Sequence, residues 1–248
     1  MASSASLVSK ASIQLAKGVP ALRAGQGYSF LLRRLHSLSG IVPIGAFLIE
    51  HFISNSEALK GPVAYNNQVK FLTSLPFVAV LEWGFIFLPL LYHALYGFYV
   101  WYRGESNLGE YSWIGNKMYT AQRWTGIVAF VYICYHLYYM RFSGVHLMGG
   151  GYNAAFWKVQ HEFQNPWAIA AYVIGITAAS WHFSYGIWLF AAKWGITVGE
   201  HARKKLGYLC LVLAVALIAI GLASIYGFVS HSLVPQPPVE SFESTMLR

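Results

Sequence analysis

The sequence predicts an all-α membrane protein, a bundle of five transmembrane helices with its N-terminus in the cytoplasm. Of the 248 residues 56% are hydrophobic and only 10% are charged, and the mean hydropathy is +0.47. Such a composition is too apolar for an ordinary soluble domain. Five windows are long and apolar enough to cross a bilayer core, which takes about 20 helical residues. Basic residues gather on alternate connections between these windows, which sets the direction of the chain.

The first 27 residues are rich in Ala, Ser, Lys and Gly, and no acidic residue occurs before Glu50. This profile fits an organellar transit peptide or a cytoplasmic arm with lipid-facing lysines. We favour the arm, because no long apolar run precedes the first window.

The transmembrane domain is expected over residues 28–232, and residues 233–248, with three prolines, are expected to form a loose external tail. The windows expected to span the membrane are residues 35–55, 77–101, 121–141, 167–192 and 207–230. Within the second window Pro89 has no N–H to donate, so it should kink that helix and free a carbonyl group.

The basic residues give the orientation. Twelve of the 17 fall on one side of the membrane in this scheme, namely Lys10, Lys17, Arg23, Arg33, Arg34, Arg103, Lys117, Arg123, Lys193, Arg203, Lys204 and Lys205. The other side has Lys60, Lys70, Arg141, Lys158 and Arg248. Because cytoplasmic loops carry the excess of Lys and Arg, the N-terminus is predicted inside and the C-terminus outside.

Four of the windows each carry a histidine in their apolar part: His51, His93, His136 and His182. At about 1.5 Å per residue, His93 and His182 lie roughly 15–16 Å from basic residues at the inner ends of their helices. His51 and His136 lie roughly 20–25 Å from such residues, nearer the outer face. A single intramembrane histidine could simply bind a neighbouring helix. Two pairs at matched depths predict two bis-histidine b haems instead.

The helical faces give a second test of this pairing. Eleven residues return to nearly the same face three turns away, about 16 Å along the axis. Small residues stand at that distance from three of the histidines, where each helix would pass the other haem: Gly40, Thr125 and Ala171, with Gly175 two turns from His182. From His93 the same step reaches Glu82, a candidate proton acceptor for a quinol beside the outer haem.

Other residues offer weaker candidates. His36 stands in RRLHSLSG with Arg33, Arg34 and Ser37 at the inner end of the first window, where the cluster could hold haem propionates or a quinone carbonyl through charge-assisted hydrogen bonds. Interfacial anchoring by the two arginines is the alternative. The remaining histidines are expected to be solvated at loops or span ends: His146, His161, His201 and His231.

Several function classes are excluded or unsupported. Cys134 and Cys210 fall inside apolar windows and no CxxCH motif occurs, so covalent c-type haem and a disulfide framework are not expected. The net charge of +8 follows orientation rules, and no patch suggests nucleic-acid binding.

The segments RRLHSLSG, FLIEH, LPLLYHALYG, QRWTGI, CYHLYY, WHFSYGIW and WGITV, in this order, make residues 28–230 resemble the cytochrome b subunit of succinate:quinone oxidoreductases. More narrowly, the chain is similar to the single-chain, five-helix, dihaem anchor of menaquinone-using bacteria. The intervals between the four histidines are nearly even, as in that family, and the last is slightly long.

The resemblance implies a subunit of succinate dehydrogenase or fumarate reductase in the bacterial inner membrane, with the dicarboxylate chemistry on a flavoprotein with covalent FAD and an iron–sulfur protein. These would dock on the cytoplasmic face. The resemblance also implies that His93 and His182 ligate the proximal haem and that His51 and His136 ligate the distal haem. Menaquinone would bind near the distal haem. Glu82 is the candidate acidic partner, and Glu50 competes with it. A lesser quinone site would include Ser37 and His36. The resemblance leaves open the reaction direction and a higher oligomer of the complex.

Two other classes remain as alternatives. The first is the cytochrome b anchor of another respiratory oxidoreductase, such as a hydrogenase or formate dehydrogenase. The second is a non-haem transporter or proton channel that uses the histidines and Glu82 as a relay.

Overall fold

The computed structural model describes residues 24–104, 108–142 and 154–235, and every regular element in these ranges is a helix. The chain divides into two compact units, one up to Leu35 and one from His36 onward, which are described separately. In the first unit the described residues belong to α2 (Ala24–Ile41), and the Arg34 guanidinium lies 4.9 Å from the centroid of the Phe30 ring.

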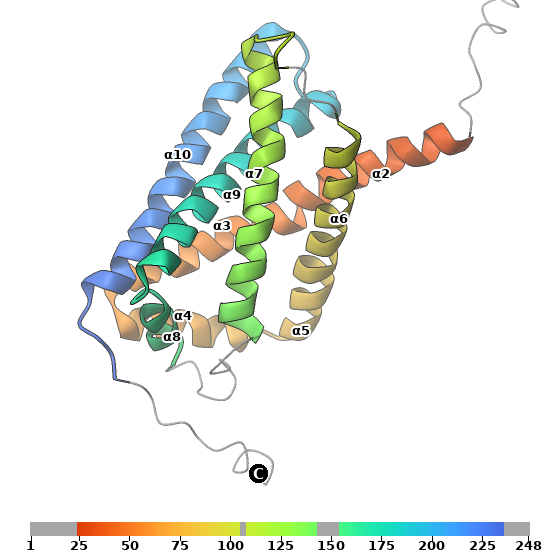
Figure 1. Cartoon of the computed structure of the whole chain (residues 1–248). Coiled ribbons are helices and arrows are strands. Elements are labelled where there is room, and N and C mark those ends of the chain that lie inside the picture. Colours follow the sequence, from red (N-terminus) through yellow and green to blue (C-terminus); the bar gives the residue numbers. More distant parts are fainter. Residues whose placement is uncertain (1–23, 105–107, 143–153, 236–248) are drawn as a thin grey trace, which may run out of the picture. The chain divides into compact units, whose positions relative to one another are not determined.

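Five helices of the second unit make up the bundle (Figure 1). They are α3 (Pro43–Ser56), α6 (Leu88–Arg103), α7 (Ile114–Leu137), α9 (Pro166–Lys193) and α10 (Glu200–Ser230). Within this bundle α3 crosses α6 and α7 at a steep angle (Figure 1). Among the described residues, three helical stretches are long and apolar enough to cross a membrane: Tyr28–Lys60, Val78–Arg103 and Glu200–Ser230.

α7 and α9 have 24 and 28 residues, so at about 1.5 Å per residue each is also long enough to span the membrane. α7 contains Asn, Lys, Gln and Arg in its first half and several Tyr, and α9 contains Tyr, Trp, His and Ser; these residues lower the mean hydropathy of a helix even where it is apolar overall. The all-helical membrane fold is therefore confirmed, and five spans stay a prediction.

The first expected helix, residues 35–55, differs from the structure. The helical chain begins earlier, at Ala24, and is interrupted at Val42 between α2 and α3. Pro43 follows the interruption and has no N–H with which to continue the helical hydrogen bonds.

The second expected helix is also divided. Its first turn is α5 (Val78–Val80), the π-helix η2 (Leu81–Phe87) follows, and α6 continues to Arg103. Pro89 is the second residue of α6, two positions after the π-helix ends, so the helix is irregular just before this proline. The kink expected there stays a prediction. α7 likewise continues into a π-helix, η3 (Tyr138–Phe142). π-Helical turns are rare and often occur at functional sites.

Short helices that the sequence analysis did not predict lie at the end of the bundle where α10 terminates (Figure 1). They are the 3₁₀ helix η1 (Glu57–Lys60), α4 (Pro62–Thr73) and α8 (Ala155–Glu162). α4 and α8 are joined by a hydrogen bond from the Phe156 backbone N–H to Asn66 Oδ1, 2.9 Å long.

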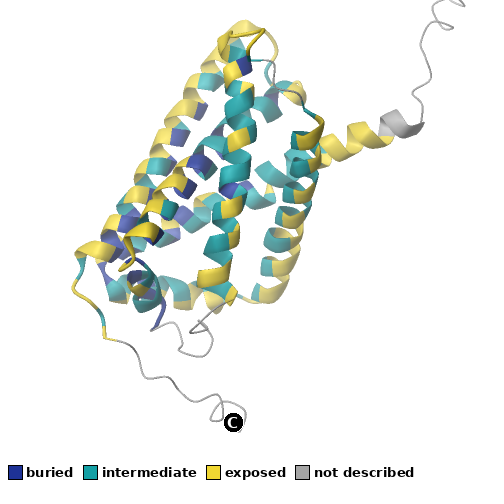
Figure 2. Ribbon diagram, viewed as in Figure 1, coloured by how far each residue is buried: buried dark blue, intermediate teal, exposed yellow. Residues whose placement is uncertain are grey.

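The best packed part of the second unit surrounds α9, which contacts both α7 and α10. Figure 2 shows most of the buried residues on α9 and α10, whereas α7 is largely of intermediate exposure. α10 lies very close to η1 at Gly227, where an added Cβ would be only 2.7 Å from the Ala58 backbone. Small residues permit such close contacts between helices in a membrane.

α6 packs differently from its neighbours. None of its residues is buried, although it contacts α3 and α7. The helix that carries His93 is therefore held by fewer protein contacts than the other long helices of the second unit.

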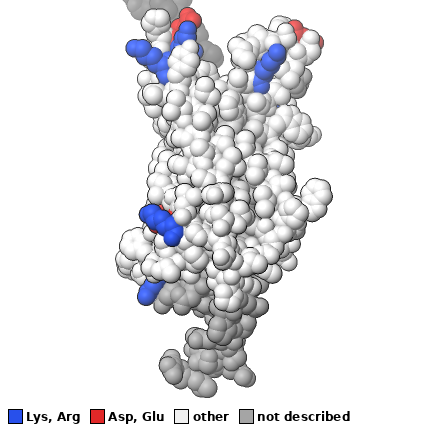
Figure 3. All heavy atoms as spheres, turned by 90° about the vertical axis from the view of Figure 1, so that its left-hand side faces the viewer, with Lys and Arg blue, Asp and Glu red and all other residues white. Residues whose placement is uncertain are grey.

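Charged side chains gather toward the two ends of the face shown in Figure 3, and a broad uncharged band separates them. α6 and α9 end at Arg103 and Lys193, at the same end of the bundle as the start of α10 (Figure 1). Lys60, Lys70 and Lys158 belong to the short helices at the opposite end. This arrangement suits a protein whose apolar middle faces lipid.

Candidate functional site

The structure brings the four intramembrane histidines together in two pairs. His93 of α6 and His182 of α9 have ring centroids 6.2 Å apart, with an interplanar angle of 85°. His51 of α3 and His136 of α7 have centroids 5.7 Å apart and an angle of 81°. Each pair joins two different helices, as the sequence analysis expected.

These separations suit a metal ion between the two rings. A metal–nitrogen bond is about 2 Å long and each imidazole nitrogen lies roughly 1 Å from its ring centroid, so one metal bound to both rings sets the centroids about 6 Å apart. Both pairs lie within about 0.5 Å of that value.

We call His93 and His182 the inner pair, and His51 and His136 the outer pair. Backbone carbonyl groups fix the tautomers of the inner pair. His93 Nδ1 lies 2.9 Å from the carbonyl oxygen of His36, and His182 Nδ1 lies 3.0 Å from that of Gln122. A carbonyl oxygen only accepts, so each Nδ1 carries the hydrogen and donates it. Each Nε2 is then left with a free lone pair, the form of histidine that binds metals.

Gln122 and His182 are linked a second time. The side-chain Nε2 of Gln122 donates to the backbone carbonyl of His182, at 2.9 Å. The two hydrogen bonds between α7 and α9 fix the position of the His182 ring. The Oε1 atom of Gln122 is buried and has no hydrogen-bond partner among the described residues.

Two glycines make room for the inner rings. An added Cβ on Gly40 would lie 2.5 Å from His93 Cε1, and one on Gly126 would lie 2.8 Å from His182 Cε1. The expectation that Gly40 stands at the level of the inner pair is confirmed by this contact. For α7 the expected small residue was Thr125, and the glycine that actually meets the ring is its neighbour Gly126.

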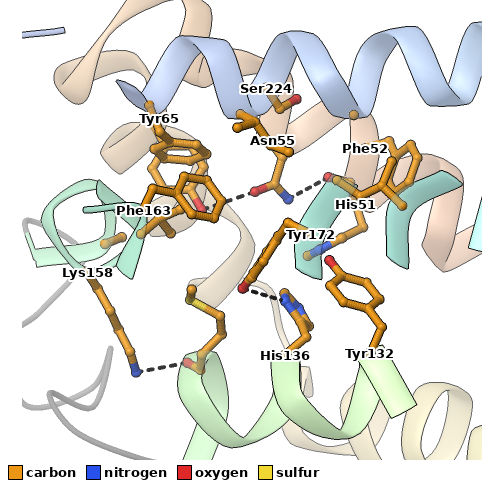
Figure 4. A pocket seen from close by; sticks show the side chains of 17 residues that line it. His51, Phe52, Asn55, Tyr65, Tyr132, His136, Lys158, Phe163, Tyr172 and Ser224 are labelled. Atoms are coloured by element: carbon orange, nitrogen blue, oxygen red, sulfur yellow. Dashed lines mark hydrogen bonds between the residues drawn. The ribbon is translucent and has the colours of Figure 1, made fainter. Parts of the chain in front are cut away.

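The outer pair lines a cavity between α3, α4, α7, α8, α9 and α10, which Figure 4 shows from close by. Most of its lining is apolar or aromatic, including Phe52, Phe163 and Ile176. The Tyr132 ring packs directly against the backbone of Gly175, because an added Cβ at this position would lie 2.0 Å from that ring. Both outer histidines thus face an internal space rather than lipid.

Polar groups of the cavity surround these histidines. The hydroxyl of Tyr172 lies 3.0 Å from His136 Nδ1. Asn55 Nδ2 donates to the backbone carbonyl of His51 at 2.7 Å, and the Tyr65 hydroxyl donates to Asn55 Oδ1 at 3.4 Å. Figure 4 shows these contacts as dashed lines.

One cation, Lys158 of α8, lies at the cavity wall. Its ammonium group donates to the carbonyl oxygen of Met140 at 3.1 Å. Burial and then the nearby Arg141 lower the pKa of Lys158, while Glu162 opposes the change.

The donor set fits an iron porphyrin better than a bare metal ion. Within the described residues no group of three or more His, Cys, Asp or Glu side chains could hold a metal, so each pair supplies two ligands only. Bare transition metals in proteins usually take three or more protein ligands. A b-type haem needs just two, because the macrocycle fills the other four positions of the iron.

The candidate quinone residue Glu82 forms an ion pair with Arg141. Arg141 Nε donates to Glu82 Oε1 at 2.9 Å and Arg141 Nη2 to Oε2 at 3.1 Å. The two side chains are 28% and 34% exposed, so the pair is reachable from outside the bundle. The competing candidate Glu50 accepts a hydrogen bond from Ser54, which in turn accepts one from Gln68 at 2.9 Å.

The lesser candidates His36 and Ser37 lie beside the inner pair. The His36 ring stacks on the His93 ring, with centroids 4.2 Å apart and an angle of 11°. Ser37 accepts a hydrogen bond from Trp194 Nε1 at 3.2 Å. Arg33 and Arg34, the candidate propionate ligands, belong to the first unit, and their role stays a prediction.

The histidines expected to be solvated differ among themselves. His161 and His201 are exposed, as expected. His231 is only partly exposed, because it packs against Phe156, with ring centroids 6.0 Å apart. His146 lies outside the described residues.

Sequence reasoning missed Gln122 and Tyr172. Gln122 precedes His136 by fourteen residues, close to four full turns, so helical periodicity would have placed it on nearly the same face at the level of the inner pair. Tyr172 stands near Ala171, at the expected level of the outer pair, but tyrosines are common in the chain and nothing in the pattern distinguishes this one.

Comparison with known proteins gives two findings. A family described as "Succinate dehydrogenase/Fumarate reductase transmembrane subunit" matches residues 105–221. The chain is also 39% identical over 200 residues to the succinate dehydrogenase cytochrome b558 subunit of Bacillus subtilis (strain 168), which covers 81% of this chain and 97% of the relative. The similarity extends over nearly the whole length of that protein.

Proposed function

Because the chain belongs to the family of succinate dehydrogenase/fumarate reductase transmembrane subunits, we propose that its two histidine pairs hold two b haems that connect an iron–sulfur subunit with quinone. The chain is the membrane-anchor cytochrome b subunit of an oxidoreductase whose dicarboxylate chemistry lies on other subunits. The comparisons favour this function over an anchor of another respiratory enzyme and over a histidine-relay transporter.

The observation that carries the two-haem proposal is the pairing of histidines from four helices. His93 and His182 would hold the inner haem and His51 and His136 the outer one. Bound there, the haems supply one-electron transfer, while the protein supplies ligation, burial and spacing. With two imidazoles on each iron no position is left for oxygen, so this chain would conduct electrons and not act as an oxygenase.

The inner pair would face the partner subunits. The basic residues that end α6 and α9 and begin α10 lie at its end of the bundle, and the excess of Lys and Arg there predicts the cytoplasmic side. A flavoprotein with FAD and an iron–sulfur protein would dock on this face. The relative is a bacterial protein, which supports the bacterial inner membrane as the location.

Quinone, with menaquinone as the expected type, would bind near the outer pair. Glu82 stays the first candidate for its proton acceptor, because it is accessible and its carboxylate is held by Arg141 within the outer half of the bundle. Glu50 is tied to Ser54 on its own helix and is the second candidate. His36 and Ser37 would form the lesser site on the inner side.

The direct test is a haem count on the purified complex. The reduced-minus-oxidised spectrum is expected to show b-type bands, and pyridine haemochrome analysis is expected to give two haems per chain. Electron paramagnetic resonance should show two low-spin ferric signals. A single haem per chain, or a high-spin signal from one of the two, would contradict the proposal.

A further inference from the structure

The outer pair differs from the inner pair in the group that binds the second ring nitrogen. Both inner histidines donate from Nδ1 to backbone carbonyl oxygens. His136 instead has a side-chain partner, the Tyr172 hydroxyl at 3.0 Å. A side chain can be exchanged by mutation without altering the backbone, so this contact can be tested in isolation.

The direction of this hydrogen bond follows from iron ligation. The iron would bind the Nε2 atom of His136, which then carries no hydrogen, so the hydrogen of the neutral ring is on Nδ1. Nδ1 donates and the Tyr172 oxygen accepts. If the hydroxyl donated to Nδ1 instead, Nε2 would be protonated and could not bind iron.

Packing holds the Tyr172 ring in place. Its side chain is 5% exposed. The ring meets Phe163 edge-on, with centroids 4.8 Å apart, and Tyr132 edge-on at 5.2 Å. Edge-to-face contacts at such separations are favourable. Figure 4 shows Tyr172 between these side chains with its hydroxyl aimed at His136.

We propose that Tyr172 is a positioning residue for the outer haem, which fixes the tautomer and orientation of His136 and lowers the reduction potential of that haem. This inference rests on the proposed ligation by His51 and His136. A ligand histidine that donates its second N–H to an acceptor is a stronger base toward the metal. A stronger base stabilises ferric iron more than ferrous iron, so the hydrogen bond favours the oxidised haem.

The test is a redox titration of the Tyr172→Phe variant in the assembled complex. The substitution keeps the ring and removes the acceptor oxygen. We expect the potential of the outer haem to rise while that of the inner haem stays constant. A tenfold change in the relative stability of the two oxidation states is a shift of about 59 mV for a one-electron couple. The low-spin signal of the outer haem should shift with it.

Tyr132→Phe is the matched control. The Tyr132 ring also lies against His136, with centroids 5.8 Å apart, and lines the same cavity, but among the described residues its hydroxyl is not hydrogen-bonded to that histidine. Its removal should leave both potentials unchanged. Equal shifts in the two variants, or no shift in Tyr172→Phe, would overturn the role of Tyr172.

The same pair of variants covers loss of the haem itself. If Tyr172→Phe retains only the inner haem while Tyr132→Phe retains both, the Tyr172 hydroxyl is needed to hold His136 on the iron, and loss of the outer haem from both variants alike would overturn the inference. A wild-type complex with one haem, or a His136→Ala variant with two, would instead contradict the proposed ligation. The two failures are therefore distinguishable.

Discussion

Arg141 binds both carboxylate oxygens of Glu82 and thereby joins the two π-helical turns of the bundle. Glu82 stands two residues after the end of α5 and Arg141 four residues after the end of α7, and neither is fully buried. An ion pair in this position costs desolvation energy, so a functional role is the default expectation for it.

Loss of the Glu82 carboxylate should impair quinone reduction. Glu82→Gln keeps the shape of the side chain and removes its capacity to accept a proton, and proton transfer by a positioned side chain contributes about 100-fold or more to rates. We expect a fall of this order in succinate:quinone activity, with unchanged electron transfer to a soluble dye. Glu57→Gln, which removes an exposed pair with Lys60, is the control. Full quinone activity in Glu82→Gln would eliminate this candidate.

Removal of a single histidine should remove one haem only. In His93→Ala we expect the inner haem to disappear from the difference spectrum and the outer one to persist, and in His51→Ala the reverse. His161→Ala, at an exposed histidine that stacks on Trp157, should retain both. A variant of one pair that affected both haems equally would argue against independent sites.

Bulk at Gly126 should displace the His182 ring. A Cβ there would lie 2.8 Å from His182 Cε1 and 3.1 Å from Nδ1, the atom that donates to Gln122. Gly126→Val is therefore expected to weaken retention of the inner haem by roughly 10- to 100-fold, the usual cost of disturbing a group that orients a metal ligand. Haem retention can be measured by mixing the complex with excess apomyoglobin and following how much haem the complex keeps. At Gly84 no atom lies within 4 Å of an added Cβ, so Gly84→Ala should have no effect.

Gln160 is expected to contribute to stability. It is 4% exposed, and its Nε2 donates to the carbonyl oxygens of Phe228, His231 and Ser232 while its Oε1 accepts from the Val234 N–H. Replacement by Leu removes these contacts and leaves partly buried backbone groups unpaired, at a cost of about 2–3 kcal/mol. The thermal midpoint of the complex in detergent should fall by roughly 5–10 °C. Gln164→Leu, at an exposed site, should leave it unchanged.

Long-range periodicity made much of this architecture predictable. Apolar windows of sufficient length indicated the long helices, and the position of each histidine along its helix indicated which rings would meet. α4 and α8 were not predicted, because both are short and of mixed polarity and are stabilised by each other and by the end of α10. The breaks at Pro43 and before Pro89 depend on how a missing N–H is accommodated, and composition does not determine that.

Side-chain partners were the least predictable part of the site. Glu82 was expected near the outer pair, but its partner Arg141 is 59 positions away in the chain, and no spacing rule relates the two. The same holds for Tyr172 and His136, which come from different helices. Such contacts depend on the rotation of one helix against another, and a single helix pattern does not encode that angle.

The hydrogen bonds of Gln160 also bear on the order in which the protein can assemble. Its four backbone partners all lie at or beyond the last turn of α10, 68 to 74 positions later in the chain. α8 can therefore make these contacts only after α10 has been synthesised. α8 also carries Lys158 at the wall of the cavity that holds His51 and His136, so this wall depends on α10 for its final support.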